Sequence, residues 1–220
     1  MPHAQPIATV DIVMFTLILK RLHVLLVKRD KDPFKSLLAL PGGYVHVDED
    51  KGSLEAARRT LESKTLIKTP YLEQLYTFAG PDRDPRGWSF SVAHYALVRE
   101  DLFEGGKAAA SILLPVDEVP QLAFDHNRIL DFALKRLRDK SSYSTLPFYL
   151  LPEKFTLPQV QDTYQIVMGE SHDKRGFRRW LNEFDILEEL PGEFRTSGGR
   201  PAQLYQLRNR EELLLRTKPV

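Results

Sequence analysis

Apolar positions in the first two-thirds of the chain form short runs typical of β-strands. The runs 10–19 and 24–28 flank a polar break, which predicts a β-hairpin. Further strands are predicted over residues 72–78 and 90–98, and residues 38–47 form another strand-like run that is broken at Pro41, Gly42 and Gly43. Helical spacing predicts one helix over 53–66, with Ser53 as its N-cap, and a second over 127–137, after a turn at 115–120.

A polar stretch at 140–145 separates this part from a more helical one, which predicts a domain boundary. The expected domains are residues 1–145 and 146–220. In the second of them, Thr156 and Gln159 fit a capping box at the start of a helix that ends at Gly169.

Asp173 would cap a second helix over 174–184, and two short apolar segments, 186–190 and 203–207, then bracket a glycine-rich loop. Helix, turn, helix and hairpin occur in this order in a winged helix-turn-helix. We therefore expect a DNA-binding module at the C-terminal end.

Composition indicates a globular protein, because 42% of the 220 residues are hydrophobic and 28% are charged. Cysteine is absent, which excludes disulfides, thiolate metal sites and a cysteine nucleophile. The net charge is +1, so any nucleic-acid surface must be local. The apolar stretch 7–19 contains Asp11 and is too short to cross a membrane, and we expect a buried strand and no membrane partner.

Positive charge gathers on one face of the predicted helix 174–184. At about 100° per residue, aromatic and aliphatic side chains occupy the opposite face. The four cations of the basic face are Lys174, Arg175, Arg178 and Arg179. Arg200 lies among glycines in the following loop, and Thr156 is added as a further candidate contact with double-stranded DNA. Two alternatives are a merely solvated basic face and a surface for an acidic protein partner.

The segments 40–45 and 54–61 resemble the Nudix box, whose pattern is Gly, five residues, Glu, seven residues, then Arg-Glu-apolar-any-Glu-Glu-any-Gly-apolar. Gly43 and Glu49 match at the right spacing, and Arg59 matches after two extra residues. The three glutamates of the second part fall on Thr60, Ser63 and Lys64, and its glycine falls on Leu66.

Nudix hydrolases hold magnesium with clustered carboxylates, and the metal clamps the pyrophosphate for attack by water. A hydroxyl such as that of Ser63 is a poor substitute for a carboxylate, and the positive charge of Lys64 would weaken the binding of a divalent cation. We therefore predict a binding pocket without turnover, with no required cofactor and no metal site. The alternatives are a pyrophosphatase acting on ADP-ribose or a related nucleotide sugar, and an amphipathic helix unrelated to the Nudix fold.

The loop 80–88 contains two arginines between prolines and glycines, and Arg83 and Arg86 can bind phosphate oxygens there. Phe34 or Trp88 could stack on a base, and His126 could donate to a phosphate or cap a helix. The alternative for this loop is an ordinary exposed pair of Arg83 with its neighbouring aspartate.

Residues 151–161, 173–179 and 199–205, together with the loop 82–87 and the triplet 124–126, resemble the NrtR family of Nudix-related transcriptional regulators. The resemblance implies an α+β chain, in which a Nudix-like mixed sheet with flanking helices precedes a winged helix-turn-helix. It also implies a cytoplasmic bacterial repressor of NAD biosynthesis or salvage genes. Such a repressor binds a palindromic operator as a homodimer and is released by ADP-ribose.

Carried over to this chain, the resemblance assigns DNA contacts to Lys174, Arg175, Arg178, Arg179 and Arg200. Effector contacts fall on Gly42, Gly43, Arg83, Asp84, Arg86 and His126. Gly176 departs from the usual pattern, in which this position is polar, and a glycine inside a helix costs about 1 kcal/mol relative to alanine. The start of this helix is therefore expected to be less rigid.

Overall fold

The computed structural model describes residues 5–67, 69, 71–103, 111–170, 173–183, 185–196, 201–210 and 213, without the side chain of Lys174. The chain forms two compact units, Met1–Thr16 with Leu22–Lys135 and Leu17–Arg21 with Arg136–Val220. The predicted domain boundary at 145/146 stays a prediction, because a compact unit and an independently folding domain need not end at the same residue. Among the described helices, none has the length and apolar character that crossing a membrane requires.

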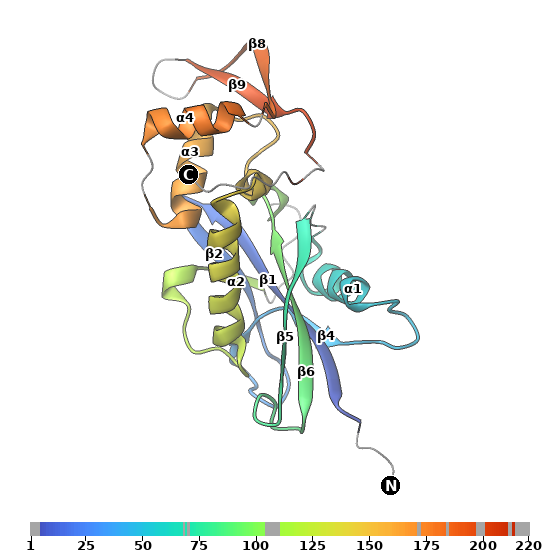
Figure 1. Ribbon diagram of the computed structural model, residues 1–220. Helices are drawn as coiled ribbons and strands as arrows, with labels where there is room; N and C mark the ends of the chain where they lie inside the picture. The colour runs from blue at the N-terminus through green and yellow to red at the C-terminus, as the bar shows by residue number, and fades with distance from the viewer. Residues whose placement is uncertain are drawn as a thin grey trace. The chain divides into compact units, whose positions relative to one another are not determined.

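A mixed seven-stranded sheet organises the first unit (Figure 1). Its strands are β1 (Ile7–Ile18), β2 (Arg21–Lys28), β3 (Leu38–Ala39), β4 (Gly42–Tyr44), β5 (Tyr71–Gly80), β6 (Ser89–Leu97) and β7 (Ser111–Pro115). The order is β3-β2-β1-β6-β5, with β4 also paired to β1 and β7 to β2. The β1–β6 pair is parallel, whereas β4, β3, β7 and β5 join their partners antiparallel.

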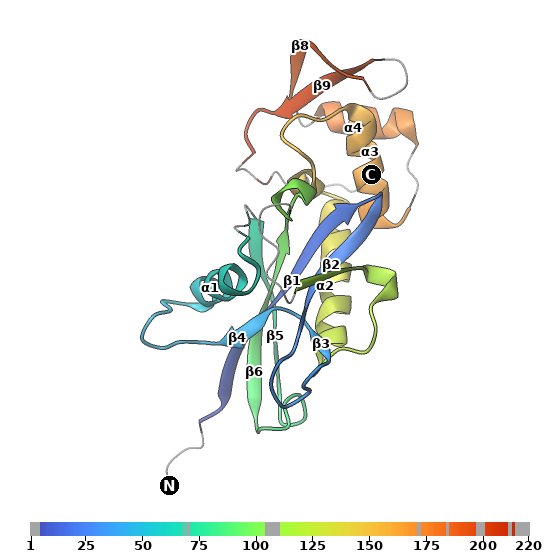
Figure 2. The same cartoon turned by 180° about the vertical axis from the view of Figure 1, so that it is seen from behind.

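Helices α1 (Ser53–Thr65) and α2 (His126–Ser141) lie on opposite faces of this sheet (Figures 1 and 2). Short 3₁₀ turns occupy Glu100–Phe103 and Val116–Glu118. Side chains alternate across a strand, so every second residue of β1 faces α1. The resulting core joins Val10, Ile12 and Met14 of β1 to Ala56, Ala57 and Leu61 of α1.

Local details of the first unit differ from the expectation. The β1–β2 turn is tighter than the predicted polar break, because Leu19 and Lys20 both take positive φ values, 48° and 60°. Ser53 is not the N-cap of α1, because Gly52 occupies that position and no side chain caps the helix. At the other end, Leu66 has a φ of 61°, where the box pattern has glycine. This left-handed C-cap supports the register proposed for the box.

The second unit contains a 3₁₀ turn (Leu146–Leu150), α3 (Leu157–Met168), α4 (Lys174–Glu183), β8 (Leu187–Arg195) and β9 (Ala202–Leu207). Figure 2 shows the two helices beside the β8–β9 hairpin. The structure confirms the predicted capping box and the left-handed Gly169 at the end of α3. Asp173 caps α4 as predicted, since its Oδ2 accepts from the Gly176 N–H at 2.8 Å. Phe184 lies outside the described residues.

The hydrophobic core of the second unit joins α3 and α4 to the segment before them. Phe177, Trp180 and Leu181 of α4 pack there with Tyr164 and Phe155. The stretch 140–145 is not an exposed linker, because Ser141 and Ser144 are completely buried. Their hydroxyls donate to backbone carbonyls one helical turn earlier. The end of α2 and the polar residues that follow it therefore belong to a packed unit.

Candidate functional site

A cleft of about 730 Å³ opens in the first unit beside α1, β1 and β4. Its lining includes six of the seven candidate effector residues, Gly42, Gly43, Arg83, Asp84, Arg86 and His126. The volume lies in the range of small-molecule pockets. Across the described part of the chain, no three His, Asp or Glu side chains are grouped so that they could hold a metal ion.

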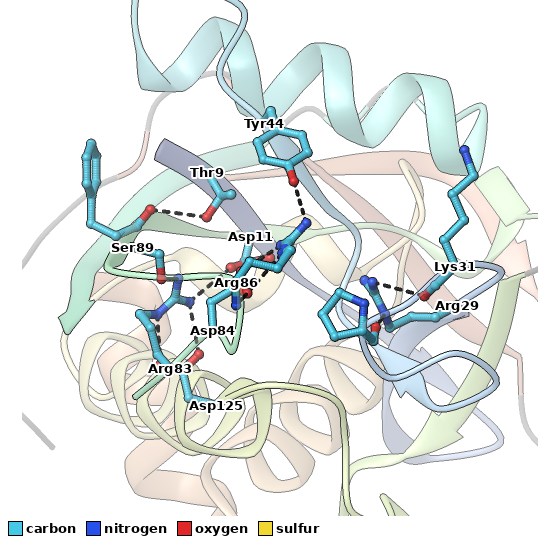
Figure 3. Close-up of polar contacts among 12 residues, drawn as sticks. Thr9, Asp11, Arg29, Lys31, Tyr44, Arg83, Asp84, Arg86, Ser89 and Asp125 are labelled. Carbon is cyan, nitrogen blue, oxygen red and sulfur yellow. Dashed lines mark hydrogen bonds and ion pairs between the residues drawn. The ribbon is translucent and has the colours of Figure 1, made fainter. Parts of the chain in front are cut away.

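Arg83 lines the cleft as a buried, already paired guanidinium (Figure 3). Its Nε and Nη2 donate to Asp125 at 3.2 and 2.9 Å, and Nη2 lies 3.6 Å from Asp11 Oδ2. Only 8% of the side chain is exposed. The predicted phosphate-binding fork is therefore occupied by protein carboxylates, and Arg83 serves to hold the cleft wall together.

Arg86, rather than Arg83, pairs with Asp84 (Figure 3). Its Nε and Nη2 donate to the carboxylate of Asp84 at 2.9 and 2.6 Å, and Nη1 donates to the Tyr44 hydroxyl. Burial would raise the pKa of Asp84, but the hydrogen bonds from Arg86 outweigh it and lower that pKa. Asp84 is only 3% exposed, so the alternative of an ordinary exposed Arg83–Asp84 pair is wrong.

His126 joins the floor of the cleft to the first turn of α2. Its Nδ1 accepts from the backbone N–H of Leu40 at 2.9 Å, and its Nε2 lies 3.4 Å from Asp11 Oδ1. Burial would raise the pKa of Asp11, but His126 and Arg83 hold it below its usual range. Both ring nitrogens therefore face protein groups, and His126 fixes the loop that leads into Gly42.

Phe124 and Tyr44 line the cleft, and sequence reasoning did not single out either ring for stacking. Phe34 and Trp88 are not part of the lining; Phe34 instead packs edge-on against Phe124, with ring centroids 4.8 Å apart. The Arg29 guanidinium lies over the Phe124 ring, 4.7 Å from its centroid. The triplet 124–126 contributed to the family resemblance. The sequence did not indicate that the aromatic ring of this triplet lines the cleft, because that depends on the fold.

The matching half of the Nudix-like box has a structural role here. Arg59 donates to Asp50 through Nε and Nη2, at 2.8 and 2.6 Å, and to the backbone oxygen of Tyr44 at 3.0 Å. Glu49 lies 3.9 Å from the same guanidinium. These contacts tie α1 to the loop before it. The three positions that lack glutamate, Thr60, Ser63 and Lys64, all line the cleft.

A second candidate site is the exposed basic face of α4. Arg175, Arg178 and Arg179 are exposed, whereas Phe177 and Trp180 are buried in the core. Within the described residues, the three arginines form no hydrogen bond or ion pair that would neutralise them. Lys174 begins the helix, and its side chain is not described. Arg200 lies outside the described residues.

Thr156 is reassigned from DNA contact to helix cap. It is only 4% exposed, and its hydroxyl accepts from the Gln159 N–H in the capping box at 3.4 Å. In return, Gln159 Oε1 accepts from the Thr156 N–H at 2.9 Å. A buried hydroxyl engaged in a cap is not available to a phosphate.

Thr156→Ala is expected to lower the free energy of unfolding by about 1 kcal/mol, the usual contribution of such a cap. Chemical denaturation would measure this loss, and Thr156→Ser should largely restore stability. DNA affinity of the folded variant, measured well below its melting temperature, should equal that of the unchanged chain. A large loss of DNA affinity in a fully folded Thr156→Ala variant would instead support the original assignment.

Comparison with known proteins matches both units. The NUDIX domain family matches residues 8–132, and the NrtR DNA-binding winged helix domain matches residues 147–207. The ADPR responsive transcriptional repressor NtrR of Acinetobacter baylyi is 37% identical over 208 residues, which cover 93% of this chain and 83% of that protein.

Two solved structures from Shewanella oneidensis are also similar. NrtR complexed with a 27mer DNA is 36% identical with a TM-score of 0.83, covering 91% of this chain and 93% of that one. The NUDIX domain of NrtR complexed with ADP ribose is 35% identical with a TM-score of 0.57, covering 61% of this chain and 90% of that one. With a Nudix-like α+β unit followed by a winged helix, and with relatives matched over nearly its full length, this chain belongs to the NrtR family of transcriptional regulators.

Proposed function

We propose that this chain is a transcriptional repressor that binds operator DNA through its second unit and releases it when ADP-ribose occupies the cleft. The observation that carries the proposal is the combination, in one chain, of a cationic cleft and an exposed basic helix. The similarity to an ADPR responsive repressor covers 93% of the chain and therefore spans both parts.

ADP-ribose suits the chemistry of the cleft. Its pyrophosphate requires cationic donors, and the lining holds Lys28, Arg29 and Lys64. Its adenine requires a flat apolar surface, and Phe124 lines the same space. The Shewanella oneidensis NUDIX domain, 35% identical to this chain, was solved with ADP ribose. These features support ADP-ribose as the effector.

Operator binding suits α4 and the hairpin that follows it. In a winged helix-turn-helix, the second helix enters the major groove while exposed arginines contact base edges or phosphates. We propose this role for Arg175, Arg178 and Arg179, which are exposed on α4. We propose a homodimer on a palindromic operator, with half-sites separated by about one helical turn or a multiple. Control of NAD biosynthesis or salvage genes is proposed on the family resemblance alone.

Continuous elements connect effector and DNA binding within the chain. Helix α2 contributes His126 to the cleft, and its residues from Arg136 onward belong to the second unit. The tip of the β1–β2 hairpin also belongs to the second unit, where Lys20 pairs with Asp162 of α3 at 2.8 Å. An effector that binds one arrangement of these elements more tightly shifts the DNA-binding equilibrium by that difference in affinity.

A gel-shift titration of the full chain on operator DNA tests the proposal. Saturating ADP-ribose should weaken DNA binding by about 5- to 150-fold, the usual range of coupling between two sites. Ribose, which lacks the pyrophosphate, should have no effect. Operator affinity that is identical with and without saturating ADP-ribose would contradict the proposed coupling.

Hydrolysis of the effector is not expected, because Thr60, Ser63 and Lys64 stand where the Nudix pattern requires carboxylates. Product release from ADP-ribose should be measured with magnesium present. Turnover above about 1 per second is typical of an enzyme and would favour the pyrophosphatase alternative.

A further inference from the structure

Seven cationic side chains line the cleft, and four of them are already engaged by protein groups. The seven are Lys28, Arg29, Lys31, Arg59, Lys64, Arg83 and Arg86. Arg59, Arg83 and Arg86 pair with the carboxylates described above. Arg29 donates through Nε to the backbone oxygen of Pro33 at 2.8 Å and through Nη2 to that of Lys31 at 3.3 Å (Figure 3).

The three lysines are the remaining cations. Within the described residues, none of their ammonium groups forms a hydrogen bond or an ion pair. In Figure 3 no dashed line joins the Lys31 ammonium to another of the residues drawn. Lys64 differs from the other two because it extends from α1, on the face that carries Thr60 and Ser63. Desolvation lowers the pKa of the Lys64 ammonium, and Arg29 acts in the same direction, whereas the carboxylates of Asp11 and Asp30 oppose the shift. An anion placed between these two cations would relieve their repulsion.

Thr60 provides a second, independent observation on the same face of α1. It is 2% exposed and lines the cleft, yet its hydroxyl has no hydrogen-bond partner in the part of the chain that the structure describes. A buried hydroxyl without a partner costs about 1–3 kcal/mol, and a ligand oxygen could satisfy it. The ammonium of Lys64 and the hydroxyl of Thr60 can both donate a hydrogen bond to an anion, whereas the ammonium has no lone pair with which to coordinate magnesium.

We propose that Lys64 is the principal contact of the effector's pyrophosphate and that the cleft binds a nucleoside diphosphate without a divalent cation. The inference rests on the proposed function, because it takes ADP-ribose as the effector. It moves the main phosphate contact from Arg83 and Arg86, the arginines that the sequence favoured, to a lysine on α1. The ammonium of Lys64 supplies the positive charge that a bound metal supplies in a hydrolase.

Calorimetric titration with ADP-ribose, in EDTA and in magnesium, tests this assignment on the full chain. The dissociation constant of the unchanged chain should be the same in both solutions. Lys64→Gln should bind about 10- to 100-fold more weakly, the value of a hydrogen bond to a charged group. Lys64→Arg should recover most of that loss. Lys51→Gln, an exposed lysine next to α1 that does not line the cleft, is the matched control and should bind normally.

Three results would overturn the inference. One is a Lys64→Gln variant that binds ADP-ribose as tightly as the unchanged chain. Another is binding by the unchanged chain that requires magnesium. The third is an unchanged chain that binds neither ADP-ribose nor ADP, which would remove the proposed function as well. If the unchanged chain binds ADP but not ADP-ribose, only the proposed effector is wrong. The same variants titrated with ADP then decide the role of Lys64.

Discussion

Replacing Arg178 by alanine is expected to weaken operator binding by about 5- to 150-fold and to leave ADP-ribose affinity unchanged. The side chain is exposed on α4, and the described residues offer it no ion pair. A good arginine contact with a base contributes about 1–3 kcal/mol of discrimination, which corresponds to this range. Fluorescence anisotropy on operator and on scrambled DNA would measure the loss and show whether specificity falls with it.

The salt dependence of binding separates two roles for Arg178. If it contacts a phosphate, the variant should lose affinity for all sequences and the salt slope should fall by about one. Arg58→Ala, an exposed arginine on α1 away from the cleft, is the matched control and should behave like the unchanged chain. Loss of both DNA and ADP-ribose binding in Arg178→Ala would indicate misfolding and would not support a DNA contact.

Gly42→Ala is expected to lower the free energy of unfolding by about 3 kcal/mol and to abolish effector binding. A Cβ atom at this position would overlap Asp11 Oδ1 and lie 2.9 Å from the backbone oxygen of Val10. The conflict arises because β4 pairs directly with β1, with Gly42 opposite Asp11. Overpacking costs typically 1–3 kcal/mol, and the upper value applies here because backbone cannot move aside easily.

Gly43→Ala provides the comparison for this clash. Its Cβ would lie 3.1 Å from Thr60 Oγ1, a contact that a small shift of the side chain can relieve. Thermal unfolding of both variants, followed by ADP-ribose titration, should therefore show a large effect at Gly42 and a small one at Gly43. Equal stability of Gly42→Ala and the unchanged chain would show that the two strands are not packed this closely.

Local signals were sufficient for most of the elements and for the family. The capping box at Thr156, the C-cap at Gly169 and the cap at Asp173 depend on residues within a few positions of each other, and all three are present. The strand β7 was not predicted. Its five residues are too few to show a clear alternation of apolar and polar side chains, and they pair with β2, which is distant in the chain.

Side-chain roles in the cleft depended on contacts between distant segments. The sequence shows Arg83 beside Asp84, but the fold pairs Arg83 with Asp125, 42 positions away, and leaves Asp84 to Arg86. Likewise, nothing near Leu40 in the chain indicates that its N–H donates to His126, 86 positions later. Such pairs form because a buried polar group needs a hydrogen-bond partner, and the fold can bring that partner from a distant part of the chain.

The sequence by itself determined which residues were available: a basic face on one short helix, a box lacking carboxylates, and two modules in one order. Those features follow from local periodicity and residue chemistry, which the chain carries at every stage of folding. Only the tertiary structure decided which cations remain unpaired around the cleft. That choice depends on the distances between side chains that are far apart in the chain, and these distances exist only once the sheet and its two helices have packed.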